Sequence, residues 1–282
     1  MEWIDSISEA LDYIEKNLDG ELTPEGIAKH VHISSFYFQK GFSMLCGFTA
    51  GEYIRRRRLA QAASELAWTD VKVIDIALKY GYDSPDSFAR AFTRFHGVTP
   101  ASVRKDGALI KSFAPLSISF NLKGGYIMDY KIEEKQAFTV KGLAKKFSYE
   151  EAFEEIPRLW GEFIESREKL GLCGMYGINI DETMGGREFE YLVADIWDGK
   201  SEVPEGVVTK TVPAFTWAVF PCVGPMPVTI QATNKKIFSE WLPNCKDYAF
   251  AAGYNIEMYA DPAEYPKGTE DENYYCEVWI PV

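Results

Sequence analysis

The spacing of apolar residues along the chain changes once. Up to about Lys105 the apolar positions recur every three or four residues, which predicts amphipathic helices. Beyond Tyr126, stretches with the two-residue alternation of half-buried strands are interrupted by two helical stretches. We therefore expect an all-α N-terminal domain and an α+β C-terminal domain with an antiparallel sheet.

A helical unit occurs twice in the N-terminal part. "HISSFYFQKGFSMLCGFTA" is followed about 50 residues later by "YGYDSPDSFARAFTRFHGVTP". Each copy predicts a short helix, a turn and a second helix that ends at a glycine in the left-handed conformation. This is the pattern of a helix-turn-helix, whose second helix can enter the major groove of DNA. The matching positions are Phe38 with Phe88, Phe42 with Phe92, and Gly47 with Gly97.

The four phenylalanines of the two copies are predicted to be core residues, so the residues between them point elsewhere. Lys40 and Arg90 occupy equivalent positions, and both offer cationic donors suited to guanine or phosphate. Gln39 can pair with adenine. The candidates for DNA contacts are Phe36, Gln39 and Lys40 in the first copy and Asp86, Ala89 and Arg90 in the second.

The net charge of −12 conceals a basic block. Residues 1–28 carry −7, residues 29–105 carry +6 and residues 106–282 carry −11. The middle block is therefore the candidate nucleic-acid surface. It includes four consecutive arginines, Arg55 to Arg58, among which Arg57 is the candidate for a phosphate contact. The alternative is that this run forms a solvated face together with stems that pack in the core.

Residues 107–125 lose the helical period and gain Pro, Ser and Gly, so we predict domains at 1–106 and 126–282 joined by a linker at 107–125. In the second domain the order strand, helix, strand, strand occurs twice, which predicts a duplicated α+β unit. The segments 128–147 and 207–224, which open the two repeats, are each expected to form one strand.

Two predicted strands of the C-terminal domain combine carboxylates with aromatic side chains. Glu257 shares a face with Tyr259, and Glu277 shares a face with Trp279 and Tyr275, because alternate residues of a strand point the same way. Such a pairing suits a flat lipophilic cation through charge attraction and cation–π contact. The alternative is a solvated sheet face. Weaker candidates are Trp160, Trp217 and Phe220.

The first 100 residues resemble the double helix-turn-helix domain of the AraC family of transcription regulators. The resemblance is carried by "IAKHVHISSFYFQKGF", "EYIRRRRLAQAASEL" and "VIDIALKYGYDSPDSFARAFTRFHGVTPASVR". It implies a module whose two recognition helices bind successive major-groove segments of promoter DNA. It also implies a contact with RNA polymerase. The departure is Asp86, where the family commonly has a neutral polar residue.

The segment from Met128 to Val282 resembles gyrase-inhibitor-like effector-binding domains through its "EMYADP" and "CEVWIPV" strands. This implies a small amphipathic or cationic effector, such as a drug or toxic compound, with Glu257 and Glu277 as anchors. Two alternatives are a hydrolase of reactive compounds and a protein-binding module without a ligand.

An enzyme is not expected, because the sequence shows no Ser–His–Asp or Cys–His set and no phosphate-binding glycine loop. No cofactor is expected either. With three histidines, a zinc site is not predicted. Five scattered cysteines and the lack of a membrane-spanning apolar run indicate a cytoplasmic protein with free thiols.

Overall fold

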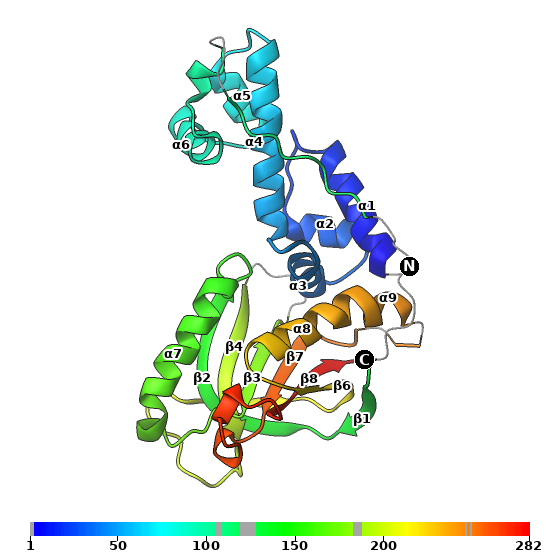
Figure 1. Ribbon diagram of the computed structural model, residues 1–282, viewed down its shortest axis with the longest axis vertical. Coiled ribbons are helices and arrows are strands. Elements are labelled where there is room, and N and C mark those ends of the chain that lie inside the picture. The colour runs from blue at the N-terminus through cyan, green and yellow to red at the C-terminus, as the bar shows by residue number, and fades with distance from the viewer. Residues whose placement is uncertain (1–2, 105–108, 119–127, 183–187, 246, 249) are drawn as a thin grey trace. The chain divides into compact units, whose positions relative to one another are not determined.

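The computed structural model describes residues 3–104, 109–118, 128–182, 188–245, 247–248 and 250–282 (Figure 1). The chain divides into two compact units. The first comprises Met1–Ile33 and Cys46–Leu122, and the second comprises Ser34–Leu45 and Lys123–Val282. The second helix of the first repeat therefore belongs to the same compact unit as the C-terminal sheet.

The first unit is helical, and its helix ends follow the capping residues in the sequence. The Thr23 side chain accepts a hydrogen bond from the Gly26 N–H at 3.1 Å, with Pro24 as the first helical residue. Gly97 ends the last long helix with φ of 82°. The helices are α1 (Trp3–Lys16), α2 (Pro24–His30), α4 (Ala50–Trp68), α5 (Val73–Lys79) and α6 (Pro85–His96), followed by the short 3-10 helix η1 (Pro100–Ser102).

Helices α4, α5 and α6 enclose a common apolar core. Phe88 and Phe92 are completely buried in it, with ring centroids 5.4 Å apart. The prediction that these two residues pack in the core is confirmed. Their neighbours in the cluster include Leu59, Ala62, Ala63, Leu66, Ile76, Ala77, Tyr80 and Val103.

Residues 109–118, the described part of the predicted linker, form no helix or strand and are held against the first unit. The Leu116 N–H donates to the Tyr53 hydroxyl oxygen at 3.0 Å, and the Lys111 N–H donates to Nδ1 of His96 at 3.1 Å. Because Nδ1 accepts that bond, the His96 proton lies on Nε2, which is 3.0 Å from the Leu59 carbonyl oxygen.

The second unit contains an eight-stranded antiparallel sheet in the order β1-β6-β8-β7-β3-β4-β2-β5. The predicted order of strand, helix, strand, strand is present twice, as β2-α7-β3-β4 and β6-α8-β7-β8. Figure 1 shows α7 and α8 over the same face of the sheet. The elements are β1 (Lys131–Lys135), β2 (Phe138–Ser148), α7 (Ala152–Leu170), β3 (Tyr176–Ile180), β4 (Glu188–Ile196), β5 (Val208–Val212), β6 (Phe215–Val223), α8 (Val228–Lys236), β7 (Tyr254–Tyr259) and β8 (Tyr275–Pro281).

Short helical segments complete this unit. A π-helical turn, η2, and a short helix, α9, continue α8 towards Asn244, and two 3-10 turns precede β8. Their bounds are η2 (Ile237–Trp241), α9 (Leu242–Asn244), η3 (Pro262–Glu264) and η4 (Gly268–Glu270).

The expectation of one strand at the start of each repeat is wrong. Each of these segments holds two strands, and the first of each pair joins the opposite repeat: β1 pairs with β6, and β5 pairs with β2. The break between β5 and β6 contains Pro213, which has no N–H to donate to a ladder. Alternation in sequence specifies which face a residue takes, but it does not specify which neighbour the strand pairs with.

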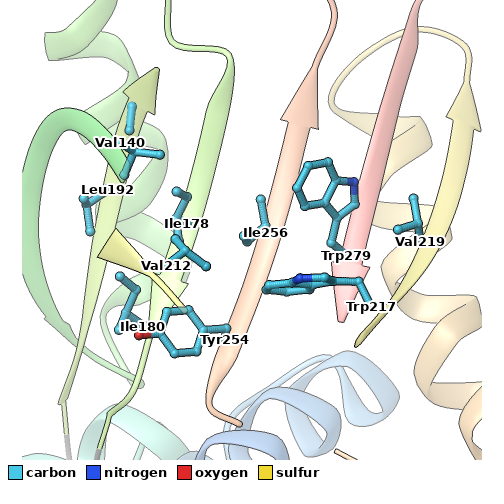
Figure 2. Packing of buried hydrophobic residues seen from close by; sticks show 11 residues of the cluster. Val140, Ile178, Ile180, Leu192, Val212, Trp217, Val219, Tyr254, Ile256 and Trp279 are labelled. Carbon is cyan, nitrogen blue, oxygen red and sulfur yellow. The ribbon is translucent and has the colours of Figure 1, made fainter. Parts of the chain in front are cut away.

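The sheet face opposite α7 and α8 carries a cluster of buried apolar residues, which Figure 2 shows. Ile256 lies directly across from Ile178 on one side and from Trp279 on the other. The Trp217 and Trp279 rings meet edge-on with centroids 6.1 Å apart. This packing makes the central strands a rigid support for the side chains that point to the other face.

Candidate effector cavity and DNA-contacting helices

Strand register places the two predicted carboxylate anchors on opposite faces of the sheet. Glu257 on β7 pairs with Val278 on β8, whereas Glu277 on β8 pairs with Met258 on β7. Directly paired residues point to the same face and consecutive residues to opposite faces, so Glu257 and Glu277 diverge. The predicted ligand residues are thereby divided: Glu257, Tyr259, Phe220 and Trp160 belong to the helix-covered side, and Glu277, Tyr275, Trp279 and Trp217 to the other side.

Glu257 lies under the two helices in a ring of polar and aromatic groups. Its carboxylate accepts from the Tyr259 hydroxyl at 2.9 Å and from Nδ2 of Asn234, on α8, at 3.2 Å. Trp160, on α7, donates its indole N–H to the Tyr191 hydroxyl at 2.9 Å and meets the Tyr259 ring edge-on at 5.3 Å. Burial, together with the nearby negative charge of Glu257, raises the pKa values of Tyr191 and Tyr259 well above the usual range.

The carboxylate of Glu277 is already engaged within the protein. It accepts from the Tyr275 hydroxyl and from the Trp279 indole N–H, both at 2.6 Å, and its side chain is almost fully buried. The Lys131 ammonium lies 3.6 Å from it, and the Lys135 ammonium lies 4.3 Å from the centroid of the Trp279 ring. Like Glu257, Glu277 therefore accepts two hydrogen bonds within the protein, and it also has a lysine nearby. Glu257 and Glu277 were both predicted as anchors; the register places them on opposite faces, and of the two Glu257 lines the cavity described next.

Trp217 and Phe220 are completely buried, with 0% of their surface exposed. Trp217 belongs to the core on the far face, and Phe220 packs edge-on against Trp241 at 4.9 Å. Neither presents surface to a ligand in this structure. Their prediction as lining residues is corrected to core residues, because large aromatic side chains on central strands are covered on whichever face they take.

A cavity of about 140 Å³ opens beside Glu257 on the helix-covered side. It is formed partly by the sheet and α7 and partly by α3 (Ser35–Cys46). Apart from Glu257, its sheet-side residues were not predicted from the sequence. The lining residues are Tyr149, Ala152, Ile156, Asn179, Phe189, Tyr191 and Glu257 from the C-terminal part, and Phe36, Gln39, Lys40, Ser43 and Met44 from α3.

The α3 residues in the cavity include all three side chains predicted to contact DNA from the first repeat. Phe36, Gln39, Lys40 and Ser43 are spaced as i, i+3, i+4 and i+7, so they share one face of the helix. Phe36 and Gln39 are buried, with 1% and 7% of their surface exposed. Both side chains point away from Phe38 and Phe42 of the same helix, as expected, but in this structure they face the cavity.

Lys40 is partly buried and donates from its ammonium group to Oδ1 of Asn255, on β7. Burial lowers its pKa to about 8, and the charge of Glu257 acts in the opposite direction. The ammonium also lies 5.9 Å from the centroid of the Phe36 ring. A cationic side chain of α3 therefore shares the cavity with the Glu257 carboxylate.

Tyr37 holds α3 to the sheet next to this cavity, a role that the sequence prediction missed. Its hydroxyl lies 2.9 Å from the Ala252 carbonyl oxygen and 3.1 Å from that of Tyr254. Its ring stacks on Phe250. The available signal was the apolar character of α3 on several sides, since a helix of that kind is normally buried all round.

The second recognition helix presents its predicted residues differently. In α6, Asp86 and Arg90 are exposed and Ala89 is partly buried. Ser84 caps the helix by accepting from the Ser87 N–H at 3.2 Å, so Asp86 is not the cap. The Asp86 carboxylate lies in the first turn, where the helix dipole favours negative charge.

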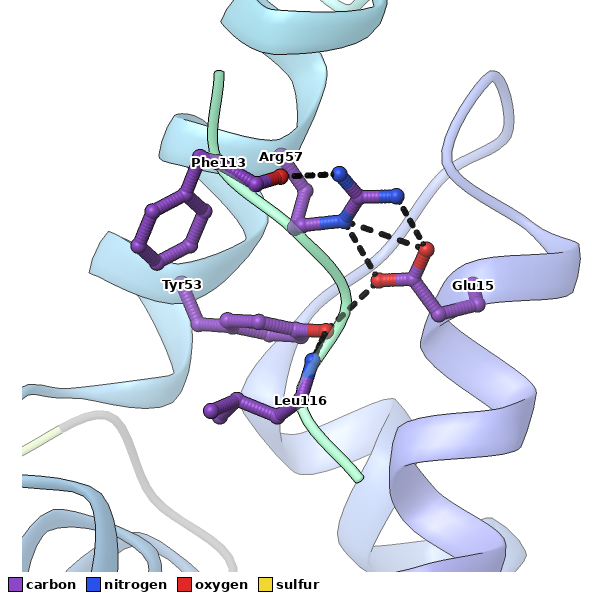
Figure 3. Close-up of polar contacts among 5 residues, drawn as sticks. All are labelled: Glu15, Tyr53, Arg57, Phe113 and Leu116. Carbon is purple, nitrogen blue, oxygen red and sulfur yellow. Dashed lines mark hydrogen bonds and ion pairs between the residues drawn. The ribbon is translucent and has the colours of Figure 1, made fainter.

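The prediction that Arg57 in α4 contacts a phosphate requires a correction, which Figure 3 illustrates. Arg57 is buried, with 5% of its surface exposed, and its guanidinium Nη2 lies 2.7 Å from a Glu15 carboxylate oxygen. It also donates to the Phe113 carbonyl oxygen. Arg57 therefore holds α1 and the 109–118 segment on α4 and is not open to a phosphate. Within the run, Arg55 is exposed.

Three further observations concern metal binding, membrane spans and cysteines. Within the described ranges, no cluster of three His, Cys, Asp or Glu side chains could hold a metal ion. Among the same residues, no helix is both long and apolar enough to cross a bilayer. All five cysteines are free.

A doubled helix-turn-helix pattern followed by a sheet domain with an aromatic cavity defines a DNA-binding regulator with an effector-binding domain. Comparison with known proteins supports both parts. Residues 131–282 match the family model for integron-associated effector binding proteins, and residues 27–106 match a helix-turn-helix domain model. The chain belongs to the integron-associated effector binding protein family through its second domain, and its helix-turn-helix part is of the AraC type.

Two of the relatives are named as transcription regulators. The HTH-type transcriptional activator AarP of Providencia stuartii is 46% identical over 98 residues, which cover 35% of this chain and 73% of AarP. The transcriptional regulator Rob of Salmonella typhimurium is 25% identical over 291 residues, which cover 98% of this chain and 97% of Rob. A solved structure of SAV2435 bound to tetraphenylphosphonium covers 55% of this chain and 94% of its own, with 20% identity and a TM-score of 0.47.

Proposed function

We propose that this transcription regulator binds promoter DNA sequence-specifically through α3 and α6 and responds to a small amphipathic or cationic effector bound beside Glu257. The observation that supports the effector class is the Glu257 carboxylate in an aromatic-lined cavity. A carboxylate among tyrosine and phenylalanine rings favours a cation over a neutral or anionic compound. The net charge of −11 over residues 106–282 also raises the local concentration of cations.

Asn234 contacts Glu257 from α8 and is not among the residues that line the cavity. Its Nδ2 donates to Glu257, while its buried Oδ1 has no hydrogen-bond partner among the described residues. An unsatisfied buried acceptor is unfavourable by about 1–3 kcal/mol.

The proposed DNA contacts depend on Arg90 in the second repeat and on Lys40 with its neighbours in the first. Arg90 is exposed on α6, and the surrounding block from residue 29 to 105 carries +6. Arg55 replaces Arg57 as the candidate for a phosphate contact. The contact with RNA polymerase and the cytoplasmic location stay predictions, as does the absence of enzymatic activity.

The effector proposal is tested by titrating the full-length protein with tetraphenylphosphonium, a permanent lipophilic cation, in a calorimeter. Wild-type protein should bind, and Glu257→Gln should lower the affinity at least tenfold because the charge attraction is lost. Glu264→Gln, at an exposed position, is the matched control. Glu277→Gln should bind normally but melt at a lower temperature, because it disrupts a satisfied buried cluster. Equal affinity in wild type and Glu257→Gln would exclude this site.

The DNA proposal is tested by gel retardation of genomic fragments at low salt, with and without tetraphenylphosphonium. Retardation that weakens steeply with added salt is expected, since phosphate neutralisation releases counterions. No retarded fragment under either condition would contradict DNA binding. Chemical conversion of a bound compound that is lost in Glu257→Gln would instead indicate an enzyme.

A further inference from the structure

The helix face of α3 that is predicted to contact DNA is the face that lines the effector cavity. Phe36 and Gln39 are buried there, and Lys40 is hydrogen-bonded to Asn255. A side chain cannot be buried in this cavity and contact a base edge at the same time. The docked position of α3 and its DNA-bound position are therefore mutually exclusive.

The size of the cavity indicates that a drug-sized effector also competes with α3. With the helix in place the cavity measures about 140 Å³. Sites for drug-sized molecules typically measure about 300–1,000 Å³. Five of the cavity's lining residues come from α3, so removal of this helix opens the cavity on one side.

The charge of Lys40 makes the competition chemically specific. Its ammonium and the Glu257 carboxylate line the same small cavity, so the free protein already supplies a cation to this carboxylate. An ammonium group is compact and strongly hydrated, and burying it is unfavourable. A lipophilic cation spreads its charge over apolar groups and loses less hydration in the same place. The effector can therefore replace Lys40 with a net gain.

Among the residues that the structure describes, the other polar contacts of α3 contain no ion pair with a carboxylate, so the helix is held at the cavity but can leave it. Tyr37 is hydrogen-bonded to backbone carbonyl oxygens and not to charged groups, and its ring stacks on Phe250. Lys40 has a neutral partner in Asn255. Hydrogen bonds between neutral groups, such as those of Tyr37, are individually weak, and the Lys40 bond is charge-assisted from the lysine side alone.

We propose that α3 is an internal competitor of the effector: the helix occupies the effector cavity in the free protein, with Lys40 as a substitute for the cation. Effector binding displaces α3 and releases Phe36, Gln39 and Lys40 for DNA. This inference rests on the proposed function of the Glu257 site. It adds that the effector increases DNA binding by the first repeat.

The test uses the full-length protein and tetraphenylphosphonium. Asn255→Ala removes the partner of Lys40 without changing Glu257 or any candidate DNA-contacting residue. Because the effector no longer competes with a firmly docked helix, its affinity should rise about tenfold. Tyr37→Phe, which loses the two backbone contacts and keeps the ring, should shift the affinity in the same direction. Asn273→Ala, at an exposed turn, is the matched control and should bind like wild type.

The position of α3 is followed by the rate of reductive methylation of Lys40, with the exposed Lys235 as an internal reference. In free wild-type protein Lys40 should react slowly. Saturating tetraphenylphosphonium should raise its rate at least tenfold, and Asn255→Ala should raise it without any ligand. The Lys235 rate should not change in any of these samples.

The outcomes separate the two proposals. If tetraphenylphosphonium binds in a Glu257-dependent manner but Lys40 stays protected and Asn255→Ala leaves the affinity unchanged, the site is correct and the competition is wrong. If wild type and Glu257→Gln both fail to bind, the proposed function fails, and the inference fails with it.

Discussion

The two recognition helices, α3 and α6, have the same spacing of buried phenylalanines but different surroundings. Phe38 and Phe42 match Phe88 and Phe92, and all four are completely buried. The outward positions differ. In α3 the predicted DNA-contacting face lines a cavity of the second unit, whereas in α6 the equivalent face is exposed. The substitutions on the outward faces are Phe36 against Asp86, Tyr37 against Ser87, and Met44 against Arg94.

This difference shows how a duplicated element can acquire a second role. The inward phenylalanines keep each helix in its fold, and the outward residues select what the helix contacts. Aromatic and thioether side chains give α3 an apolar face that can be buried inside the protein. Asp86 and Arg94 make the equivalent face of α6 costly to bury, so it stays exposed.

The contribution of the shared phenylalanines to stability is tested by Phe88→Ala, the change with the largest expected effect. Phe88 has no exposed surface and packs within the core of α4, α5 and α6. Truncation should lower the free energy of unfolding by about 3–5 kcal/mol through lost burial and a residual cavity. Urea denaturation measures this loss. Arg90→Ala on the exposed face of the same helix is the control and should change stability by less than about 0.5 kcal/mol.

The difference between the outward faces is tested by Phe36→Asp, which gives α3 the residue that α6 has. The change removes about 1.5–3 kcal/mol of apolar burial and puts a second carboxylate into the cavity that holds Glu257. We expect α3 to leave the cavity, so that Lys40 is methylated at least tenfold faster without an effector. Phe36→Leu should keep Lys40 protected. Unchanged protection in Phe36→Asp would show that Phe36 does not hold the helix.

The charge of Lys40 predicts a pH dependence that α6 does not share. Burial in the docked state lowers its pKa from 10.5 to about 8, so between these values the docked lysine is neutral while a released lysine is charged. Docking therefore becomes more favourable as the pH rises above about 8, by about 1.4 kcal/mol per pH unit. Below about 8 both states are charged, and this gain is absent.

Calorimetry with tetraphenylphosphonium measures the effect, since this cation does not titrate. Its affinity should fall up to about tenfold between pH 7.5 and pH 9, because α3 competes more strongly. Tyr191 and Tyr259 stay protonated in this range because their pKa values are raised. Lys40→Met should abolish the dependence. A pH effect that persists in Lys40→Met would come from another group.

The smallest expected effect is on the salt dependence of DNA binding. With a duplex selected from random sequence by the wild-type protein, Arg90→Ala should reduce the salt slope by about one with or without tetraphenylphosphonium. Lys40→Ala should reduce it by the same amount only in the presence of tetraphenylphosphonium. Equal effects of the two variants in the absence of the compound would show that both helices contact DNA freely.

The two faces of the sheet, like the two recognition helices, show that a local sequence pattern does not specify what a side chain contacts. Alternation correctly predicted that Tyr259 accompanies Glu257 and that Trp279 accompanies Glu277. It could not predict that the two sets diverge, because this depends on pairing Glu257 with Val278. A shift of the register by one residue would have brought both carboxylates to one face.

Much of the helical unit could be read directly from the sequence. Thr23 and Pro24 begin α2, Gly97 ends α6 in the left-handed conformation, and the phenylalanine frame is buried. These features depend on contacts between residues close together in the chain, which local spacing records. Arg57 was placed wrongly because its partner Glu15 lies 42 residues away, and nothing in the arginine run indicates that partner.

The amino-acid sequence by itself determined the two kinds of domain and the repeat within each, and it supplied the candidates for contacts with DNA or a cation, since these follow from periodicity and side-chain chemistry. Only the tertiary structure decided which strands exchange between repeats, which carboxylate faces a cavity and where the outward side of α3 is buried. Those outcomes depend on pairing between distant segments, where many partners are compatible with the same local pattern and packing selects one.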